Sequence, residues 1–305
     1  MSVGPVVVGV DNTVDSRSAV LWAVQEAALS QTSLLIVHSS QRPSVTAPGG
    51  DHLSAAPRAG EDVDFSVLQD AQALARAAQP DVVVNTLLSS ADPAQALINL
   101  SSQARLLVLG SRSEATKGMS LLASKRTLVS ARAHCPVLLL GPVSAFGSLR
   151  KISRVIVGVA ATRAGRAAVT FATAEAVRRD VTLHLVRVEP EPAAQLPGQP
   201  AGLQAVNALN AQAREIHRNY PGLTVLASSV TGHAAESLPA YSDSSSILVV
   251  GCRQSNDRWS TRLGPVTTWV THRSRGPVVV VGFAHSPDGP RSEAALPEVG
   301  SALVL

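Results

Sequence analysis

Short apolar runs alternate with segments of helical periodicity along most of the chain. Residues 5–10 are almost continuously apolar, as expected of a parallel strand that is buried on both faces. Residues 19–28 then place apolar side chains at helical spacing, and a second apolar run follows at 34–37. In the first half we predict strands at 5–10, 34–37, 82–88, 106–109 and 137–140, and helices at 19–28, 62–78, 93–100 and 121–131.

The second half repeats this pattern together with several short motifs. The Val-Gly-Val at 8–10 recurs at 157–159, 149 residues later, and the run that ends at Gly110 recurs at Gly251, 141 residues later. Motifs that keep their order at a nearly constant offset indicate a duplicated domain. In this half we predict strands at 155–159, 182–188, 223–230, 247–250 and 278–281, and helices at 164–177, 203–217, 234–241 and 265–272.

Alternation of strands and helices predicts an α/β fold, with two tandem doubly wound parallel-sheet domains that carry helices on both faces. We expect a first domain over 1–142, a linker over 143–150, a second domain over 151–283 and a flexible tail over 284–305. Each half is expected to keep its own sheet. We also expect the halves to pack through their fifth strands, because an exposed apolar edge strand promotes aggregation unless it is covered.

Composition and charge narrow the class of protein further. An apolar content of 45% is ample for two cores, but only 3% of residues are aromatic, so those cores must be aliphatic and rich in alanine. No apolar run approaches the roughly 18 residues of a membrane span, and no signal peptide is visible. The net charge of +4 comes from scattered arginines without interleaved aromatics, which argues against nucleic-acid binding. We expect a cytoplasmic protein without membrane partners.

Candidate chemistry lies in the loops that follow the first and fourth predicted strands. In an open parallel sheet, ligands bind beyond the carboxyl ends of the strands, where the strand order reverses. The loop at 110–124 leaves its strand through Gly110 and enters a helix after Ser124. Free N–H groups at a helix start form an anion site that suits phosphates. Three basic residues near this loop would add positive charge: Arg112, Lys125 and Arg126.

These loops resemble those of the universal stress protein family. The resemblance is carried by Gly-Ser-Arg at 110–112, Ala-Ser at 123–124, His-Cys-Pro-Val at 134–137 and the first strand ending before Asp11. It covers residues 4–283 and is similar to the tandem form of the family. It implies five-stranded sheets in the order 3-2-1-4-5. Many members bind ATP through a G-x2-G-x9-G-(S/T) loop, with an Asp after the first strand contacting adenine, and members without that pattern generally do not.

The first repeat keeps the spacing of this pattern but has lost two of its three glycines. Ser113 and Ala123 stand where glycine would let the backbone approach a phosphate closely. The acidic residue and the serine at the helix start are kept. The resemblance therefore implies that any ATP site lies in the first repeat, formed by Asp11, Gly110, Arg112, Ser113, Ala123, Ser124 and Lys125.

The second repeat departs further from the pattern. Its motif positions are occupied by Gly251, Gln254, Gly264 and Pro265. Ala160 replaces the acidic residue and so removes the acceptor for adenine, while proline removes one N–H donor from the helix start. Trp259 would fill part of the cleft. We expect the second repeat to bind no nucleotide.

The same residues also have simpler explanations. Asp11 would cap the following turn through its carboxylate, and Arg112 and Lys125 would lie on a solvated surface. Cys135 is expected to be a buried structural thiol. Cys252 falls inside the second loop, which leaves a redox role open, although reactivity requires a lowered thiol pKa.

Three kinds of function remain open. The first is a non-catalytic stress-response regulatory protein that holds at most one nucleotide. The second is a weak ATP hydrolase that uses Asp11 and its loop. The third is an interaction scaffold with degenerate pockets, whose partners would be other copies of itself or a regulatory protein. The two repeats share no candidate base, nucleophile or metal-binding carboxylate pair, which argues against an enzyme and against a metal site.

Overall fold

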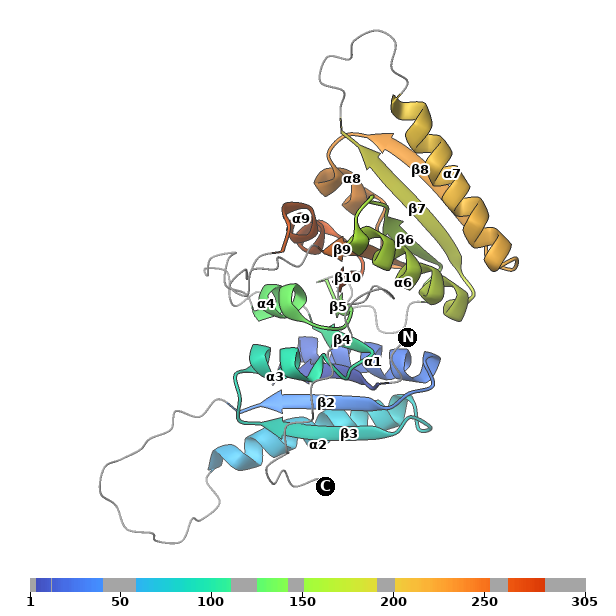
Figure 1. The fold of residues 1–305 in the computed structure, drawn as a ribbon. Helices are drawn as coiled ribbons and strands as arrows, with labels where there is room; N and C mark the ends of the chain where they lie inside the picture. Colours follow the sequence, from blue (N-terminus) through green and yellow to red (C-terminus); the bar gives the residue numbers. More distant parts are fainter. Residues whose placement is uncertain are drawn as a thin grey trace.

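A computed structural model describes residues 4–11, 13–40, 59–110, 125–141, 151–190, 201–252 and 263–282. These residues form one ten-stranded sheet with helices on both faces (Figure 1). The linker expected at 143–150 and the tail expected at 284–305 lie outside the described residues.

In the first half, each predicted strand and helix is present. The elements are β1 (Val6–Val10), α1 (Val14–Leu29), β2 (Leu34–Ser39), α2 (Ala59–Ala78), β3 (Val84–Ser89), α3 (Pro93–Leu100), β4 (Leu106–Leu109), α4 (Lys125–Arg132) and β5 (Val137–Leu139). The largest difference is that α1 begins five residues earlier than its apolar pattern predicts. After Val14 its first turn is polar, and Asp15 there complements the positive end of the helix dipole.

The second half follows the same order of elements. They are β6 (Arg154–Gly158), α6 (Arg163–Arg179), β7 (Thr182–Glu189), α7 (Ala201–Asn219), β8 (Val225–Thr231), α8 (Ala234–Ala240), β9 (Ser246–Cys252), α9 (Pro265–Arg273) and β10 (Val278–Gly282). Strand β9 continues through Cys252, which pairs with Gly282 of β10. Cys252 therefore lies in a strand and not in the loop where we expected it.

The sheet runs in the order β3-β2-β1-β4-β5-β10-β9-β6-β7-β8. Each half therefore has the predicted order 3-2-1-4-5, and its strands are parallel. The predicted contact through the fifth strands is also present, as an antiparallel pair in which Leu138 lies opposite Val279. Our expectation of two separate sheets is wrong, because pairing β5 with β10 edge to edge joins the two halves by backbone hydrogen bonds.

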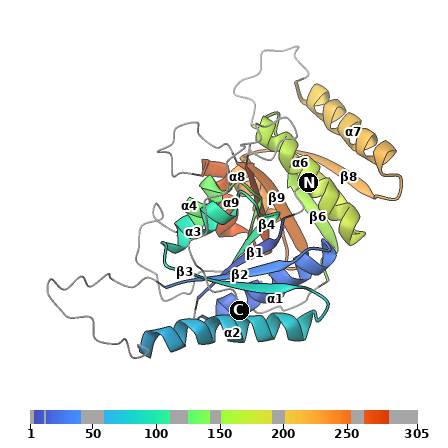
Figure 2. The same cartoon turned by 60° about the horizontal axis from the view of Figure 1, so that its bottom comes forward.

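The core consists of two apolar layers, one on each side of the sheet. Helices α1, α2, α6 and α7 cover one face, and α3, α4, α8 and α9 cover the other (Figure 2). Successive strand residues alternate between the layers, so Val6 and Val8 face α1 while Val7 faces α3. Both layers continue across β5 and β10. Within the described ranges, none of the helices combines the length and the apolarity that crossing a bilayer requires.

Candidate functional site

The fold brings Asp11 and Gly110 together at the carboxyl edge of the first half. Asp11 follows β1 and Gly110 follows β4, and these neighbouring strands are parallel, with Gly9 opposite Leu109. The strand order reverses at β1, which lies between β2 and β4. This is the switch point at which open α/β sheets bind ligands.

Asp11 is exposed, and its carboxylate organises the start of α1. Oδ1 accepts hydrogen bonds from the Thr13 backbone N–H at 3.2 Å and from the hydroxyls of Thr13 and Ser16. Ser16 Oγ in turn accepts from the Asp11 backbone N–H at 2.9 Å. Asp11 therefore caps the turn, as the simpler interpretation of this residue predicted, and the capping bonds hold the carboxylate in one orientation.

A cavity of about 550 Å³ opens beside Asp11, between α1 and α2. Asp11, Thr13 and Ser16 form its polar end, and Val20 and Leu74 belong to its apolar wall. The sequence pattern indicated Asp11 and Thr13, because they follow the first strand, but not Ser16. It did not indicate the wall, because α2 reaches this position only through tertiary packing.

His38 is a residue of this region that the sequence analysis missed. It is the penultimate residue of β2, where Nδ1 lies 2.9 Å from the Val10 carbonyl oxygen and Nε2 lies 3.1 Å from Asp64 Oδ1 on α2. The ring thereby ties two strands and a helix together next to Asp11. Its position after an apolar strand, at the same edge as Asp11, was the available signal.

The phosphate side of the predicted site is only partly described. Arg112, Ser113, Ala123 and Ser124 lie outside the described residues, so their assignment stays a prediction. Lys125 begins α4, and its Nζ lies 3.3 Å from Asp92 Oδ2, with both side chains about half exposed. This contact fits the surface interpretation of Lys125.

Asp92 and Arg126 explain how α3 and α4 are held near this edge. Asp92 caps α3 by accepting the Ala94 N–H at 2.9 Å. Slight burial opposes its ionisation, but the hydrogen bonds from Lys125 and the helix backbone outweigh burial and lower the pKa of Asp92. Arg126 Nη2 donates to the Leu140 carbonyl oxygen at 2.9 Å, so this side chain reaches toward the end of β5.

The glycine that both repeats keep has a packing role. A Cβ added at Gly110 would lie 3.1 Å from the Asp15 carbonyl oxygen, in the first turn of α1. At Gly251 the added Cβ would lie 2.5 Å from the Ala164 carbonyl oxygen, in the first turn of α6. Helix packing therefore accounts for the glycine at Gly251 independently of any nucleotide, whereas the contact at Gly110 is milder.

The second half has no acidic group at the position of Asp11. Ala160 stands there and is exposed, and α6 is capped by Thr162, whose Oγ1 accepts the Gly165 N–H at 3.0 Å. Pro265 occupies the first turn of α9 after Gly264. As expected, this helix start therefore lacks one backbone N–H donor. Gln254 and Trp259 lie outside the described residues.

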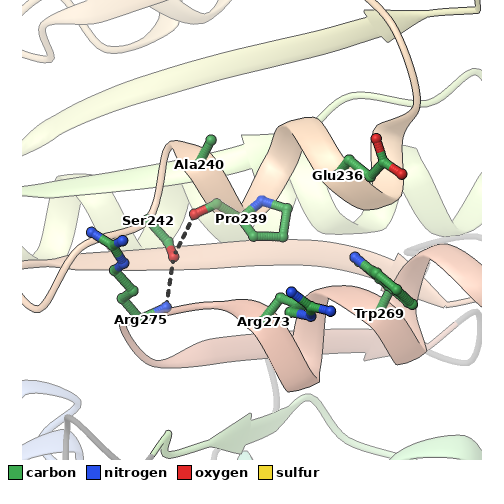
Figure 3. A pocket seen from close by; sticks show the side chains of 7 residues that line it. All are labelled: Glu236, Pro239, Ala240, Ser242, Trp269, Arg273 and Arg275. Carbon is green, nitrogen blue, oxygen red and sulfur yellow. Dashed lines mark hydrogen bonds between the residues drawn. The ribbon is translucent and has the colours of Figure 1, made fainter.

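A second cavity, of about 530 Å³, lies between α8 and α9 (Figure 3). The Arg273 guanidinium carbon lies 4.8 Å from the Trp269 ring centroid, and Glu236 and Arg275 also line the space. Ser242 Oγ accepts the Arg275 N–H at 3.1 Å. Because Ser242 and Arg275 precede β9 and β10, the cavity extends toward the amino edge of the sheet. None of the predicted site residues lines it.

Both cysteine thiols are buried. Burial raises the pKa of Cys135 to about 12, as fits the structural thiol that we expected. Burial also raises the pKa of Cys252, which is 1% exposed. A raised pKa suppresses the thiolate, so the redox role considered for Cys252 is not supported.

We expect both thiols to resist alkylation in the native protein near pH 8 and to react fully after denaturation. The physical reason is that burial removes both the thiolate and the access of the reagent. Mass spectrometry of iodoacetamide-treated protein, native and denatured, measures this directly. Rapid labelling of native Cys252 would contradict the burial described here.

Within the described parts of the chain, no three His, Cys, Asp or Glu side chains are grouped so as to hold a metal ion.

The Universal stress protein family matches residues 3–141 and again residues 151–282.

Similar proteins cover most of the chain. Universal stress proteins Rv2005c and Rv2623 of Mycobacterium tuberculosis are each 27% identical to it, over 282 and 286 residues. Each alignment covers 90% of this chain, and 96% and 95% of the relatives. The crystal structure of a universal stress protein from Archaeoglobus fulgidus matches 92% of this chain and 97% of its own, with a TM-score of 0.65 at 15% identity. With two matches that span most of its length, this chain belongs to the universal stress protein family and contains two tandem domains of that fold.

Proposed function

We propose that this protein is a non-catalytic stress-response regulator that binds ATP in its first domain and not in its second. The observation that carries the proposal is the contrast between Asp11, which borders a cavity at the switch point of the first domain, and Ala160 at the equivalent position of the second. The cavity volume of about 550 Å³ falls within the range usual for small-molecule sites.

The chemistry of the site supports adenine recognition by Asp11. An exposed carboxylate accepts a hydrogen bond from the exocyclic amino group of adenine. The bonds from Thr13 and Ser16 all end on Oδ1, so they orient the carboxylate before a ligand arrives. Such preorganisation reduces the entropy lost on binding.

The phosphates would lie along the loop from Gly110 to the start of α4. In this proposal the loop backbone and Ser124 supply N–H and hydroxyl donors, while Arg112 and Lys125 supply positive charge. Lys125 would have to leave Asp92 to reach a phosphate. Since that ion pair is exposed, releasing Lys125 would cost little.

The alternative function is a nucleotide-free interaction scaffold. It is favoured by the finding that Asp11 has a capping role and Gly110 a packing role, because neither residue then requires a ligand to explain its presence. Partners would be other copies of the chain or a regulatory protein. Nucleotide binding by the intact protein decides between the two functions.

Calorimetry with ATP on the full-length protein should show one site, which Asp11→Ala weakens by about 1–3 kcal/mol, or roughly 5- to 150-fold. The loss follows from removing a positioned acceptor for a polar group of the ligand. Lys125→Ala should cost less, and its effect should fade as salt is raised, because an exposed charge is screened.

Asp81→Ala is the matched control, because it removes an exposed carboxylate of the first domain that does not line the cavity. Binding by Asp81→Ala should equal that of the wild type. Two equivalent sites, or undiminished affinity in Asp11→Ala, would refute the assignment of the pocket. Absence of binding in the wild-type protein would leave the scaffold function.

A further inference from the structure

A buried network of ion pairs crosses the junction between the two domains. Glu26 on α1 and Glu175 on α6 are 2% and 3% exposed. Arg179 on α6 donates to both carboxylates, from Nη2 to Glu26 and from Nε to Glu175 Oε2 at 3.2 Å. Arg178 donates to Glu175 as well. One guanidinium of the second domain therefore joins a carboxylate from each domain.

The two glutamates occupy equivalent positions of the repeat. They are 149 residues apart, the same offset that relates the first strands of the two domains. The offset holds to the ends of both helices, where Gln31 and Asp180 have positive φ values of 50° and 52°. The two carboxylates therefore meet across the approximate two-fold axis that relates the domains.

The arginines do not obey this symmetry. Leu29 and Ser30 stand in the first domain where the second has Arg178 and Arg179. The cation that reaches Glu26 across the junction thus comes from the partner domain. The first domain contributes Arg105, which interacts electrostatically with both glutamates. Burial and repulsion from Arg178 lower the pKa of Arg105.

Burial makes Glu26 dependent on that partner. Burial raises the pKa of Glu26, the nearby Glu175 raises it further, and Arg179 opposes both effects. Arg179, which lies between two carboxylates, is stabilised in its charged form, so its own pKa is raised despite burial. Removing one member of a buried ion pair leaves a charge without water or a counter-ion, which strongly disfavours the buried state.

We propose that this network makes the first domain pair selectively with a second domain, which supplies Arg178 and Arg179. The same network prevents two first domains from pairing with each other. Two first domains could otherwise join through β5 in the same antiparallel geometry, as a two-fold symmetric pair. In that pair Glu26 would face Glu26, with Leu29 and Ser30 in place of Arg178 and Arg179, and Arg105 would be the nearby cation that remains. A pair of second domains would keep its arginines on both sides. Repulsion between the two Glu26 carboxylates disfavours a pair of first domains, and this penalty makes the first domain selective for a second domain.

The test uses the full-length protein with a protease site placed in segment 143–150, folded first and cut afterwards. The two halves of the wild type should remain together as a pair. Arg179→Ser, which introduces the residue of the first domain, should raise the dissociation constant of the cut halves by about 100- to 1,000-fold. Arg166→Ser is the matched control, because it removes an exposed arginine from the same helix and should change little. Equally tight halves in Arg179→Ser would overturn the proposal.

Mixing separately tagged cut proteins tests the specificity itself. Wild-type first halves should be captured with second halves and not with each other, whereas Glu26→Gln, which removes the repulsive charge, should yield first-half dimers. If wild-type first halves pair with each other as readily as with second halves, the proposal fails. Should Arg179→Ser alone not fold, Glu26→Gln/Arg179→Ser should fold and stay paired, because Glu175 keeps Arg178.

Discussion

Leu138→Asp is expected to destabilise the whole protein by more than about 4 kcal/mol, the range reached when a core substitution buries an unpaired charge. Leu138 is 1% exposed and lies opposite Val279, at the centre of the strand pair that joins the two halves. An aspartate there would be surrounded by apolar side chains from both domains. Urea denaturation followed by circular dichroism measures the change in the free energy of unfolding.

Val83→Asp is the control for this substitution. Val83 precedes β3, the outermost strand of the first half, and is 65% exposed, so a charge there stays in water. We expect this variant to remain within about 0.5 kcal/mol of wild type. Equal stabilities for the two variants would mean that β5 is open to solvent and that the sheet is not continuous.

Gly251→Ala should destabilise the protein by about 3 kcal/mol, whereas Gly110→Ala should cost about 1 kcal/mol or less, as expected for severe and mild overpacking. The added methyl group would meet the Ala164 carbonyl oxygen at 2.5 Å in one case and the Asp15 carbonyl oxygen at 3.1 Å in the other. The neighbouring groups are helix backbone, which cannot move aside without shifting the helix start. Thermal unfolding of the two variants measures the difference.

The same pair separates packing from ligand binding at the motif glycine. If Gly110 matters chiefly for the approach of a phosphate, Gly110→Ala should lose ATP affinity while keeping its stability. If it matters chiefly for packing against α1, Gly110→Ala should lose stability, by up to about 1 kcal/mol, and keep its ATP affinity. Equal loss of stability at the two positions would contradict the tighter packing that we describe for the second half.

The hydrophobic pattern predicted the elements well because it reports burial directly. Residues 106–109 are apolar without interruption, as expected of a strand that is buried on both faces, and β4 has the predicted bounds. The α1 boundary was missed because the residues that follow Val14 in its first turn are polar, so an apolar periodicity cannot register them. The turn before the helix is held by hydrogen bonds among Asp11, Thr13 and Ser16. The cavity wall on α2 and the role of His38 depended on which elements pack side by side.

By itself, the sequence determined that this protein is a duplicated α/β domain, because repeat offsets and burial patterns are local properties of the chain. The strand order 3-2-1-4-5 in each half was implied by the resemblance to the universal stress protein family. It also identified Asp11 and Ala160 as the point where the two carboxyl edges differ. Only the tertiary structure decided that β5 and β10 merge the halves into one sheet, that Gly110 and Gly251 serve helix packing, and that two equivalent glutamates share Arg179. Each of these depends on contacts between residues far apart in the chain, and the free energy of such contacts is set by shape and desolvation at the place where the surfaces meet.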